Sequence, residues 1–349
     1  MFDLNSLIRP HIISMKPYSS ARDEYSGKEG VFLDANENSL GSVTHTDFSR
    51  YPDPLQLDLK LKMGPIFGLN HQNIFLGNGS DEPIDLLIRA FCRPGIDNII
   101  LLPPTYGMYK VSAVLNDIEI RYAPLTADFQ LDTESILKNI DGNTKLIFLC
   151  SPNNPTGNLV DKGEIIKLIK SFNGVVVLDQ AYADFAPEGD FTPNLDEFPN
   201  LVILKTFSKA WGMAGLRLGM AFASSQIIAL LNKIKSPYNI NQITQNQAIE
   251  ALDNFERKNF FVQQLNVLKK NLIKQLVELP IVIKVNPSDT NYLLVKFKES
   301  AAVFSYLIDN KVIVRDRSAE LNCEGCLRIT VGSEMENQKL MALLQSYNG

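Results

Sequence analysis

Short apolar runs alternate with helical stretches from about residue 74 to residue 223, and this alternation limits the fold more than any other feature of the chain. The runs are NIFL (73–76), NIILL (98–102), KLIFLC (145–150), GVVVLD (174–179), LVIL (201–204) and MAFA (220–223). Runs that are apolar throughout and bounded by Gly, Pro and Asn are typical of parallel strands covered on both faces. Between them, DEPIDLLIRAF (81–91) and KGEIIKLIKSF (162–172) have apolar residues at helical spacing. We therefore predict an α/β fold with a mainly parallel sheet.

The C-terminal part of the chain predicts a second, smaller α+β unit. Leucines three or four residues apart place one long helix over residues 255–279, and Pro280 follows it. Beyond this helix we expect strands at 290–297, 311–316 and 326–332 and helices near 301–310 and 334–347. A length of 349 residues with 45% hydrophobic content also suits about two domains better than a single core.

The first thirty residues are polar and contain two prolines and two glycines, which predicts an arm with little structure of its own. We therefore expect the chain to divide into three parts. These are an N-terminal arm at 1–30, a large α/β domain at 31–254, and a small α+β domain at 255–349 to which part of the N-terminal segment is joined.

Composition argues against several classes of function. Charged residues make up 21% of the chain, the net charge is −5 and no stretch is strongly basic, so we expect no nucleic-acid partner. The first residues, MFDLNSLIRP, lack the pattern of a signal peptide, and no apolar run reaches the ~20 residues that span a bilayer. We expect a cytoplasmic protein without a membrane partner.

The cysteines do not indicate a disulfide framework or a metal site. Only four occur in the whole chain, which suits a reducing cytoplasm. Cys323 and Cys326 form a C-x-x-C pair, but there is no second pair, and no histidine follows His71. Neighbouring cysteines in a loop explain this pair better than zinc or redox chemistry does, so we expect no metal.

Polar turns follow the predicted strands, and ligands of open parallel sheets bind beyond the carboxyl ends of the strands. After NIFL comes GNGSDEP, in which Gly79 permits a tight turn and Ser80 or Asp81 can begin a helix whose free N–H groups attract an anion. SPNNPTG follows KLIFLC, and Asp179 ends VVVLD with Tyr182 three residues later. Each feature alone also fits ordinary turn chemistry or helix capping.

The stretch KTFSKAWGMAGLRLG (205–219) follows the strand LVIL and contains two lysines. Lys205 continues the strand and should point along or out of the sheet, whereas Lys209 lies in the turn within reach of the strand ends. Thr206 and Ser208 supply two hydroxyls, and Arg217 supplies a fork that binds phosphate bidentately. Taken singly, each of these residues is also common in solvated turns.

Together these turns meet the needs of a pyridoxal phosphate enzyme. Such an enzyme requires a lysine that forms a Schiff base, a cradle for the cofactor phosphate, and a carboxylate that keeps the pyridine nitrogen protonated. Lys209 supplies the amine and Asp179 the carboxylate, while Thr206, Ser208, Arg217 and the GNGSD turn supply the cradle. We predict that these side chains share one site.

The chain resembles the fold-type I pyridoxal phosphate aminotransferases, class II, and within them the histidinol-phosphate aminotransferase family. The resemblance covers nearly the whole chain, from residue 17 to residue 332. The motifs that carry it are PYSSAR (17–22), DANEN (34–38), YPDP (51–54), GNGSDE (77–82), PPTYGMY (103–109), SPNNPTG (151–157), LDQAYADF (178–185), TFSKAWGMAGLRLG (206–219), VRD (314–316) and CLRITVG (326–332). Ser39, Gln180 and Trp211 depart from the usual family pattern, but none of them replaces a catalytic group.

The resemblance implies a role for each candidate residue of the cofactor site. Lys209 would hold the cofactor and move the proton, Asp179 would pair with the pyridinium nitrogen, and Tyr182 would hydrogen-bond the ring oxygen together with Asn154. Tyr106 would stack on the ring. The residues that would hold the phosphate are Gly79, Ser80, Thr206, Ser208 and Arg217, joined by Tyr51 of a neighbouring subunit, and Asp81 would also belong to the cofactor site. The resemblance therefore also implies a homodimer with shared sites.

The resemblance further implies where the substrate binds. Arg328 of LRITVG is the usual carboxylate-binding arginine of such enzymes, and for a phosphate monoester it would bind the phosphate with Arg315 and Tyr18. Asn36 would lie near the substrate.

The activity that the resemblance implies is reversible amino transfer between L-histidinol phosphate and 2-oxoglutarate, through a Schiff base on Lys209 and a pyridoxamine form. The products would be imidazole acetol phosphate and L-glutamate, a step of histidine biosynthesis. Two other enzyme classes remain open: a threonine-phosphate decarboxylase and an aromatic amino acid aminotransferase. A ligand-binding regulator would need a nucleic-acid-binding appendage, for which 349 residues leave no room.

Overall fold

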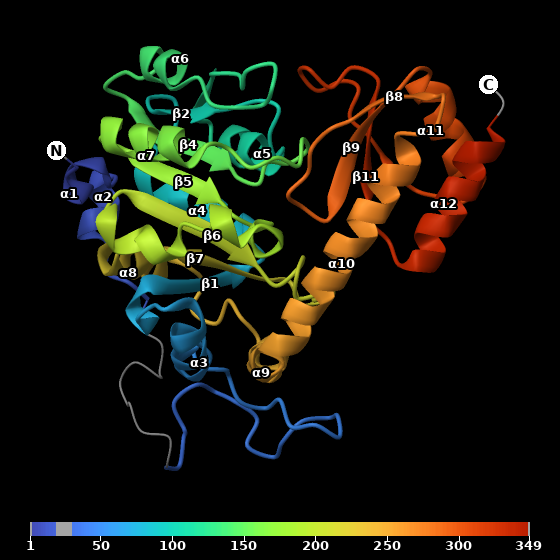
Figure 1. Cartoon of the computed structure of the whole chain (residues 1–349). Coiled ribbons are helices and arrows are strands. Elements are labelled where there is room, and N and C mark those ends of the chain that lie inside the picture. The colour runs from blue at the N-terminus through green and yellow to red at the C-terminus, as the bar shows by residue number, and fades with distance from the viewer. Residues whose placement is uncertain (1, 19–29, 348–349) are drawn as a thin grey trace.

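A computed structural model describes residues 2–18 and 30–347 of the chain and contains two sheets (Figure 1). The larger sheet has seven strands in the order β1-β7-β6-β5-β4-β2-β3. Its strands are β1 (Ile74–Asn78), β2 (Asn98–Leu101), β3 (Glu119–Tyr122), β4 (Thr144–Cys150), β5 (Val175–Asp179), β6 (Leu201–Thr206) and β7 (Leu218–Phe222). All run parallel except β7, which is antiparallel to both β1 and β6. The predicted α/β class with a mainly parallel sheet is confirmed.

Helices cover both faces of the seven-stranded sheet, because alternate residues of the central strands point to opposite faces. In β5, Val175 and Val177 contribute to one apolar core, and Val176 and Leu178 contribute to the other. The first core packs against α4 (Asp81–Phe91), α5 (Met108–Leu115) and α8 (Ser225–Ile234). The second packs against α3 (Leu57–Phe67), α6 (Thr133–Lys138), α7 (Lys162–Ser171) and α9 (Gln242–Asp253).

The four-stranded sheet lies beside the carboxyl-end side of the larger sheet, with strand order β10-β11-β9-β8 (Figure 1). Its strands are β8 (Val282–Val285), β9 (Tyr292–Phe297), β10 (Arg315–Asp316) and β11 (Cys326–Thr330), all antiparallel to their neighbours. One face packs on α10 (Phe255–Leu276), α11 (Ser300–Asp309) and α12 (Glu334–Ser346) through its own apolar core. The other face turns toward the larger sheet, where Tyr292 donates a hydrogen bond to the Asn153 carbonyl at 2.6 Å.

Two strands, β3 and β8, were missed, and both are edge strands whose side chains are only partly buried. β3 forms an edge of the larger sheet with half-exposed and exposed side chains, and β8 has the same pattern in the smaller sheet. The predicted strand at 311–316 is wrong over most of its length, since only Arg315 and Asp316 pair with β11. The long helix α10 ends at Leu276, three residues before the predicted end.

The N-terminal segment has more structure than its composition predicted. Residues 4–7 and 10–14 form the short helices α1 (Leu4–Leu7) and α2 (Pro10–Ser14), and the side chains of Leu4 and Ile12 are buried against the larger sheet's helices. Tertiary burial stabilises these helices, which are too short to be stable alone. Residues 19–29 of the predicted arm lie outside the described residues, and the boundaries 1–30, 31–254 and 255–349 stay a prediction.

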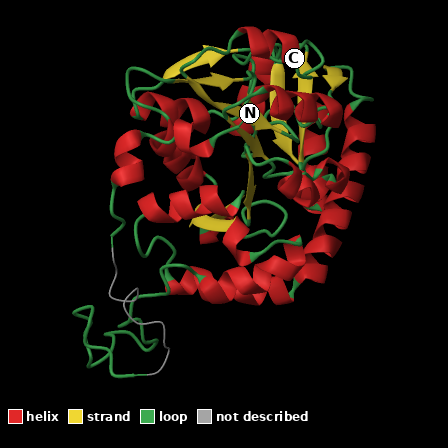
Figure 2. Cartoon of the chain, turned by 90° about the vertical axis from the view of Figure 1, so that its left-hand side faces the viewer, coloured by secondary structure: helices red, strands yellow, loops and turns green. Residues whose placement is uncertain are grey.

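Residues 30–56 reach away from the body in both views (Figures 1 and 2). Several of their apolar side chains are exposed, among them Val31, Leu33, Leu40 and Val43. The loop is fixed at its base by Glu37, whose carboxylate accepts hydrogen bonds from Arg50 and from the Tyr51 N–H, both at 2.7 Å. Within residues 2–18 and 30–347, the helices are too short or too polar to cross a lipid bilayer.

We predict that Gly219→Ala destabilises the protein, because β7 passes very close to the turn after β1. A Cβ atom on Gly219 would meet the backbone of Gly79 and Ser80 at less than the closest normal contact. Overpacking of this kind costs about 1–3 kcal/mol of the free energy of unfolding. Chemical denaturation should show this loss, whereas the control Gly215→Ala, whose Cβ meets nothing within 4 Å, should leave stability nearly unchanged. Equal stability of the two variants would contradict the close approach.

Candidate active site

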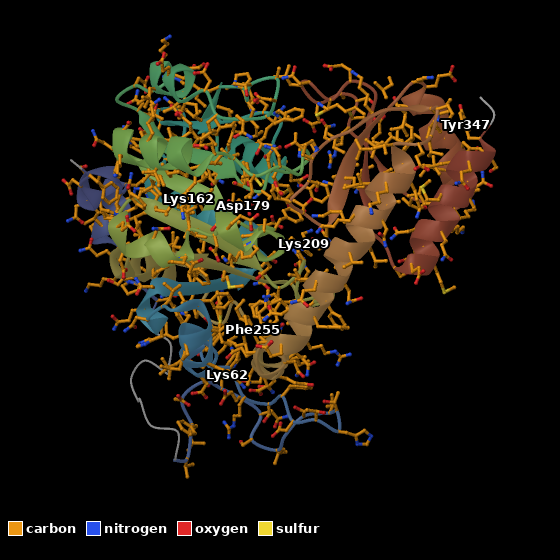
Figure 3. All side chains as sticks on the ribbon, in the orientation of Figure 1. Lys62, Lys162, Asp179, Lys209, Phe255 and Tyr347 are labelled. Atoms are coloured by element: carbon orange, nitrogen blue, oxygen red, sulfur yellow. The ribbon has the colours of Figure 1, made fainter. Side chains whose placement is uncertain are left out.

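A pocket of about 310 Å³ opens beyond the carboxyl ends of the parallel strands, on the side that faces the four-stranded sheet. Figure 3 shows Asp179 and Lys209 on this side of the larger sheet. The predicted site residues that line the pocket are Gly79, Ser80, Asp81, Tyr106, Asn154, Asp179, Tyr182, Thr206, Ser208, Lys209, Arg217, Arg315 and Arg328. Residues from turns far apart in the sequence therefore meet in one place.

The turn between β1 and α4 forms one wall of the pocket. Gly79 has a φ of +70°, which favours glycine, and its N–H donates a hydrogen bond to the Arg217 carbonyl at 2.7 Å. Ser80 immediately precedes α4, so the unpaired N–H groups of the first helical turn face the pocket. This geometry suits an anion.

The turn after β6 completes the anion-binding wall. Thr206 Oγ1 donates to the Leu218 carbonyl at 3.2 Å and accepts a hydrogen bond from the Ser208 N–H at 3.1 Å. The guanidinium of Arg217 lies 3.6 Å from the Asp81 carboxylate, and Tyr106 donates to the same carboxylate at 3.2 Å. Hydroxyls, an arginine and a helix N-terminus thus converge from two turns.

Asp179 ends β5 and is buried beneath the pocket. Its carboxylate accepts hydrogen bonds from the Tyr109 hydroxyl at 2.7 Å and from the Ala181 N–H at 3.0 Å. Burial raises the pKa of this carboxyl, and the Tyr109 hydroxyl acts in the opposite direction. A buried carboxylate of this kind gains stability from a cationic partner in the pocket.

Sequence reasoning missed Tyr109, although it stands in the motif PPTYGMY. The residue is fully buried in α5 and stacks on Phe148 with ring centroids 4.9 Å apart. In the sequence it could not be distinguished from a core tyrosine. Only the position of α5 over β5 shows that its hydroxyl meets Asp179.

Lys205 and Lys209 have different surroundings in the structure. Lys205 is buried within β6 and its amine is held by the Asp190 carboxylate at 2.6 Å. Lys209 has its amine in the pocket, 5.4 Å from the ring centroid of Tyr182. Partial removal of water by the pocket walls, followed by repulsion from Arg328, lowers the Lys209 pKa, while Asp179 opposes this shift. Lys209 is therefore the reactive candidate.

The wall opposite the anion cradle joins the two sheets. Tyr182 is buried and contacts the ring of Tyr292 edge-on at 5.2 Å. Arg328 in β11 donates to the Asn154 side-chain oxygen at 2.5 Å and lies over the Tyr292 ring. The Asn154 amide oxygen thus accepts from Arg328, and its amide nitrogen is the group that can donate to a ligand.

Arginines of the smaller sheet line the outer part of the pocket. Arg315 lies opposite Arg328 in the antiparallel register of β10 and β11, and both were predicted. Arg317 also lines the pocket and was missed. The spacing of two from Arg315 was the available signal, because alternate residues of a strand share a face.

Three predicted residues lie outside this pocket. Tyr51 is exposed and stacks on Tyr238 with ring centroids 4.4 Å apart, and with Asn36 it lines a separate hollow beside the start of α9. Tyr18 is exposed to solvent as well. None of the three side chains therefore reaches Lys209 of its own chain.

The cysteine pair does not contribute to the pocket. Cys323 and Cys326 are buried free thiols, Cys326 at the start of β11 and Cys323 in the turn before it, and burial raises the pKa of each. Within the described part of the chain, no group of three or more His, Cys, Asp or Glu side chains is arranged to hold a metal ion.

Residues 25–346 match the family model of the class I and II aminotransferases. The match covers well over half of the chain, so the chain belongs to the aminotransferase class I and II family. The predicted family is confirmed.

Two individual relatives are similar to the chain over nearly its full length. The chain is 52% identical over 346 residues to the histidinol-phosphate aminotransferase of Cytophaga hutchinsonii, with 99% of each chain covered. It is 51% identical to the enzyme of the same name from Bacteroides fragilis, covering 99% of this chain and 100% of the other.

Among solved structures, the histidinol-phosphate aminotransferase of Sinorhizobium meliloti in complex with pyridoxal 5′-phosphate has a TM-score of 0.79 at 22% identity, covering 97% and 96% of the two chains. The L-threonine-O-3-phosphate decarboxylase of Porphyromonas gingivalis has a TM-score of 0.72 at 24% identity, covering 85% and 92%. Identities this low show the shared fold alone.

We predict that Tyr109→Phe lowers stability in a pH-dependent manner. The variant leaves the buried Asp179 carboxylate without a charge-assisted hydrogen bond, a loss of about 1–3 kcal/mol at pH 7. The folded-state pKa of Asp179 is raised, so its charge opposes folding increasingly as pH rises above the unfolded-state value. Denaturation of the cofactor-free protein should therefore show a large loss at pH 7 and a smaller loss near pH 4.

The control for this experiment is Tyr122→Phe, since Tyr122 is an exposed residue of the edge strand β3. Its stability should follow the unmodified protein at both pH values. A Tyr109→Phe loss that is the same at both would mean that the hydroxyl does not stabilise the ionised carboxylate.

Proposed function

We propose that this chain transfers the amino group between L-histidinol phosphate and 2-oxoglutarate, giving imidazole acetol phosphate and L-glutamate. Full-length relatives about half identical to it are named histidinol-phosphate aminotransferases. The observation that carries the proposal is the position of Lys209 between two anion-binding groups. The cradle of Ser80, Thr206 and Arg217 lies at one end of the pocket, and the arginines of the smaller sheet lie at the other.

The pocket fits pyridoxal 5′-phosphate as the cofactor. Its phosphate would match the N–H groups of α4 with Ser80, Ser208 and Arg217, and its pyridinium nitrogen would pair with the buried Asp179 carboxylate. Bound there, the cofactor supplies an aldehyde carbon that captures amines and a ring that accepts the electron pair left on the substrate carbon.

Lys209 is the proposed anchor of the cofactor and the residue that moves the proton. Its lowered pKa makes the neutral amine available at a lower pH than for an ordinary lysine. Once the substrate amine has displaced it, the Lys209 amine takes the proton from the substrate carbon. It then returns this proton to the carbon that the cofactor supplies. The reach of its amine across the pocket, near the Tyr182 ring, suits that role.

The remaining pocket residues orient the cofactor. We assign Tyr106 to the face of its ring and Asn154 and Tyr182 to its ring oxygen. Burial raises the Tyr182 pKa, so its hydroxyl remains protonated and donates. The Asn154 amide nitrogen is assigned as a second donor, and its amide oxygen already accepts a hydrogen bond from Arg328.

Arg315 and Arg328 are the proposed substrate-binding pair. Their guanidinium groups stand opposite each other across β10 and β11 and face a pocket with an excess of cationic side chains. A phosphate monoester and a dicarboxylate both present an anion far from the reacting carbon, so one arginine pair serves both substrates in turn.

A homodimer explains why three predicted residues lie outside the pocket. Tyr51 and Asn36 belong to the loop at 30–56, whose exposed apolar side chains include Val31 and Leu40, and Tyr18 is exposed as well. An exposed apolar surface of this kind favours an interface. We propose that this loop packs on a second copy, brings Tyr51 to the partner's cofactor phosphate, and places Asn36 and Tyr18 near a substrate.

The free, buried cysteines support a cytoplasmic location.

The reaction is tested by comparing two assays on the purified protein loaded with pyridoxal phosphate. We expect L-glutamate to form from L-histidinol phosphate and 2-oxoglutarate, and no carbon dioxide to be released from O-phosphothreonine. Carbon dioxide release without glutamate formation would identify a decarboxylase, the activity of one solved structure with the same fold. Faster turnover of an aromatic amino acid would identify the third class of enzyme.

We predict that Lys209→Ala abolishes amino transfer and leaves the fold intact, because its amine is exposed to the pocket and supports no strand contact. The cofactor should still bind through the phosphate cradle. Circular dichroism, cofactor absorption and glutamate formation measure the three properties. As a control, Lys162→Ala removes a lysine at the start of α7, outside the pocket, and should keep full activity.

We predict that mixing Tyr51→Ala and Lys209→Ala variants restores activity that neither has alone. In a hybrid dimer, one site receives both defects and the other receives neither. Random pairing makes half of the dimers hybrids, so about a quarter of the normal activity should return. The activity is measured after the two variants are unfolded together and refolded. No recovery, with each variant still dimeric by sedimentation, would show that Tyr51 does not act across the interface.

A further inference from the structure

Three arginines, not two, share the inner face of the smaller sheet. Arg315 and Arg328 lie opposite each other in the register of β10 and β11, and Arg317 follows Arg315 by two residues. Alternate residues of an extended segment point to the same side. The Arg317 N–H donates to the Cys326 carbonyl at 2.9 Å, which continues the pairing with β11 for one more residue. All three side chains line the pocket that contains Lys209.

The side chain of Arg317 is held only loosely by the protein. One of its terminal nitrogens lies 3.5 Å from the Glu320 carboxylate, and both groups are partly exposed. The Arg317 Nε atom is buried and has no hydrogen-bond partner among the described residues. A buried donor without a partner is costly, and an ion pair of this length and exposure contributes little. The guanidinium therefore has donors left for a ligand.

The charges around Arg317 favour an anionic ligand. Five cationic side chains line the pocket, Lys209, Arg217, Arg315, Arg317 and Arg328, whereas the carboxylates that line it are Asp81 and Asp179. Both carboxylates lie on the cofactor side, where Asp81 is paired with Arg217. Burial and the repulsion of Arg328 and Arg315 lower the Arg317 pKa, against the attraction of Glu320. An anion bound between the three arginines relieves that repulsion.

The two proposed substrates differ in the anion that they present. A phosphate monoester carries close to two negative charges at neutral pH and three acceptor oxygens, whereas a carboxylate carries one charge and two oxygens. One bidentate arginine satisfies a carboxylate. A third arginine adds binding that only the phosphate can use fully.

We propose that Arg317 is a specificity-determining residue that binds the substrate phosphate together with Arg315 and Arg328. The proposal deepens the proposed function and rests on it for the identity of the phosphorylated substrate. Arg317 selects the phosphate monoester over the dicarboxylate, and it takes no part in the proton transfer at Lys209.

Two half-reactions, followed separately by the cofactor absorption, test this role. In Arg317→Gln, we expect KM for L-histidinol phosphate to rise by at least about tenfold, the effect of losing one hydrogen-bonding partner of a charged group. Maximal turnover and KM for L-glutamate should change by less than about twofold, because that carboxylate is satisfied by one bidentate arginine. Arg317→Lys, which keeps the charge, should recover part of the loss.

A matched variant separates ligand binding from a structural role. Glu320→Gln breaks the ion pair between Arg317 and Glu320 and leaves the arginine in place. If Arg317 only held the loop to Glu320, both variants would have the same defect, and the proposal would be overturned. We expect Glu320→Gln to bind the phosphorylated substrate as well as the unmodified enzyme does.

Calorimetric titration of the cofactor-loaded protein makes the test independent of the reaction. Glycerol 3-phosphate serves as an unreactive phosphate monoester and glutarate as an unreactive dicarboxylate. Arg317→Gln should weaken binding of the first by at least about tenfold and of the second by less than about twofold. Equal losses for both, or a loss for neither, would refute the proposal. If the unmodified protein fails to turn over L-histidinol phosphate, the proposed function fails, while these titrations still decide the role of Arg317.

Discussion

The buried carboxylate of Asp179 is the constraint on which the site depends. It stands at the end of a central strand, below the pocket, with Tyr109 and the Ala181 N–H as its hydrogen-bond donors. Burial opposes its ionised form and raises its pKa, against the effect of its hydrogen-bond donors. The surrounding strands cannot relax around the charge because both faces of the sheet are packed. A cationic ring nitrogen would stabilise this carboxylate, which is why we propose that the cofactor binds here.

The second constraint is the excess of positive charge that the smaller sheet brings to the pocket. One face of that sheet is apolar and packs on α10, α11 and α12, while the other face presents Arg315, Arg317 and Arg328. The hydrogen bond from Arg328 to Asn154 ties this face to the loop after β4. Strand alternation couples the two faces, since Val314 precedes Arg315, Leu327 and Ile329 flank Arg328, and all three apolar residues belong to the small core.

The sequence predicted the central strands of the large sheet and the turns after them, because fully buried strands leave continuous apolar runs. It failed where burial is partial: β3 and β8 are edge strands with half-buried and exposed side chains, and β10 pairs over only two residues. The antiparallel direction of β7 was also unforeseen, since the run MAFA contains no information about direction. Tyr109 and Arg317 were missed for a related reason, since only the fold brings Tyr109 to Asp179 and Arg317 to the pocket.

The N-terminal segment contains predicted site residues that do not line the pocket of their own chain. DANEN and YPDP were predicted from resemblance to belong to the site, yet Asn36 and Tyr51 line a different hollow. Their loop is nevertheless ordered by its own contacts, because the Glu37 carboxylate binds both the Arg50 guanidinium and the Tyr51 N–H. A loop that is internally fixed and exposes apolar side chains such as Leu40 and Val43 loses little conformational entropy when it packs on another surface. This preorganisation supports the contact with a second copy that we propose.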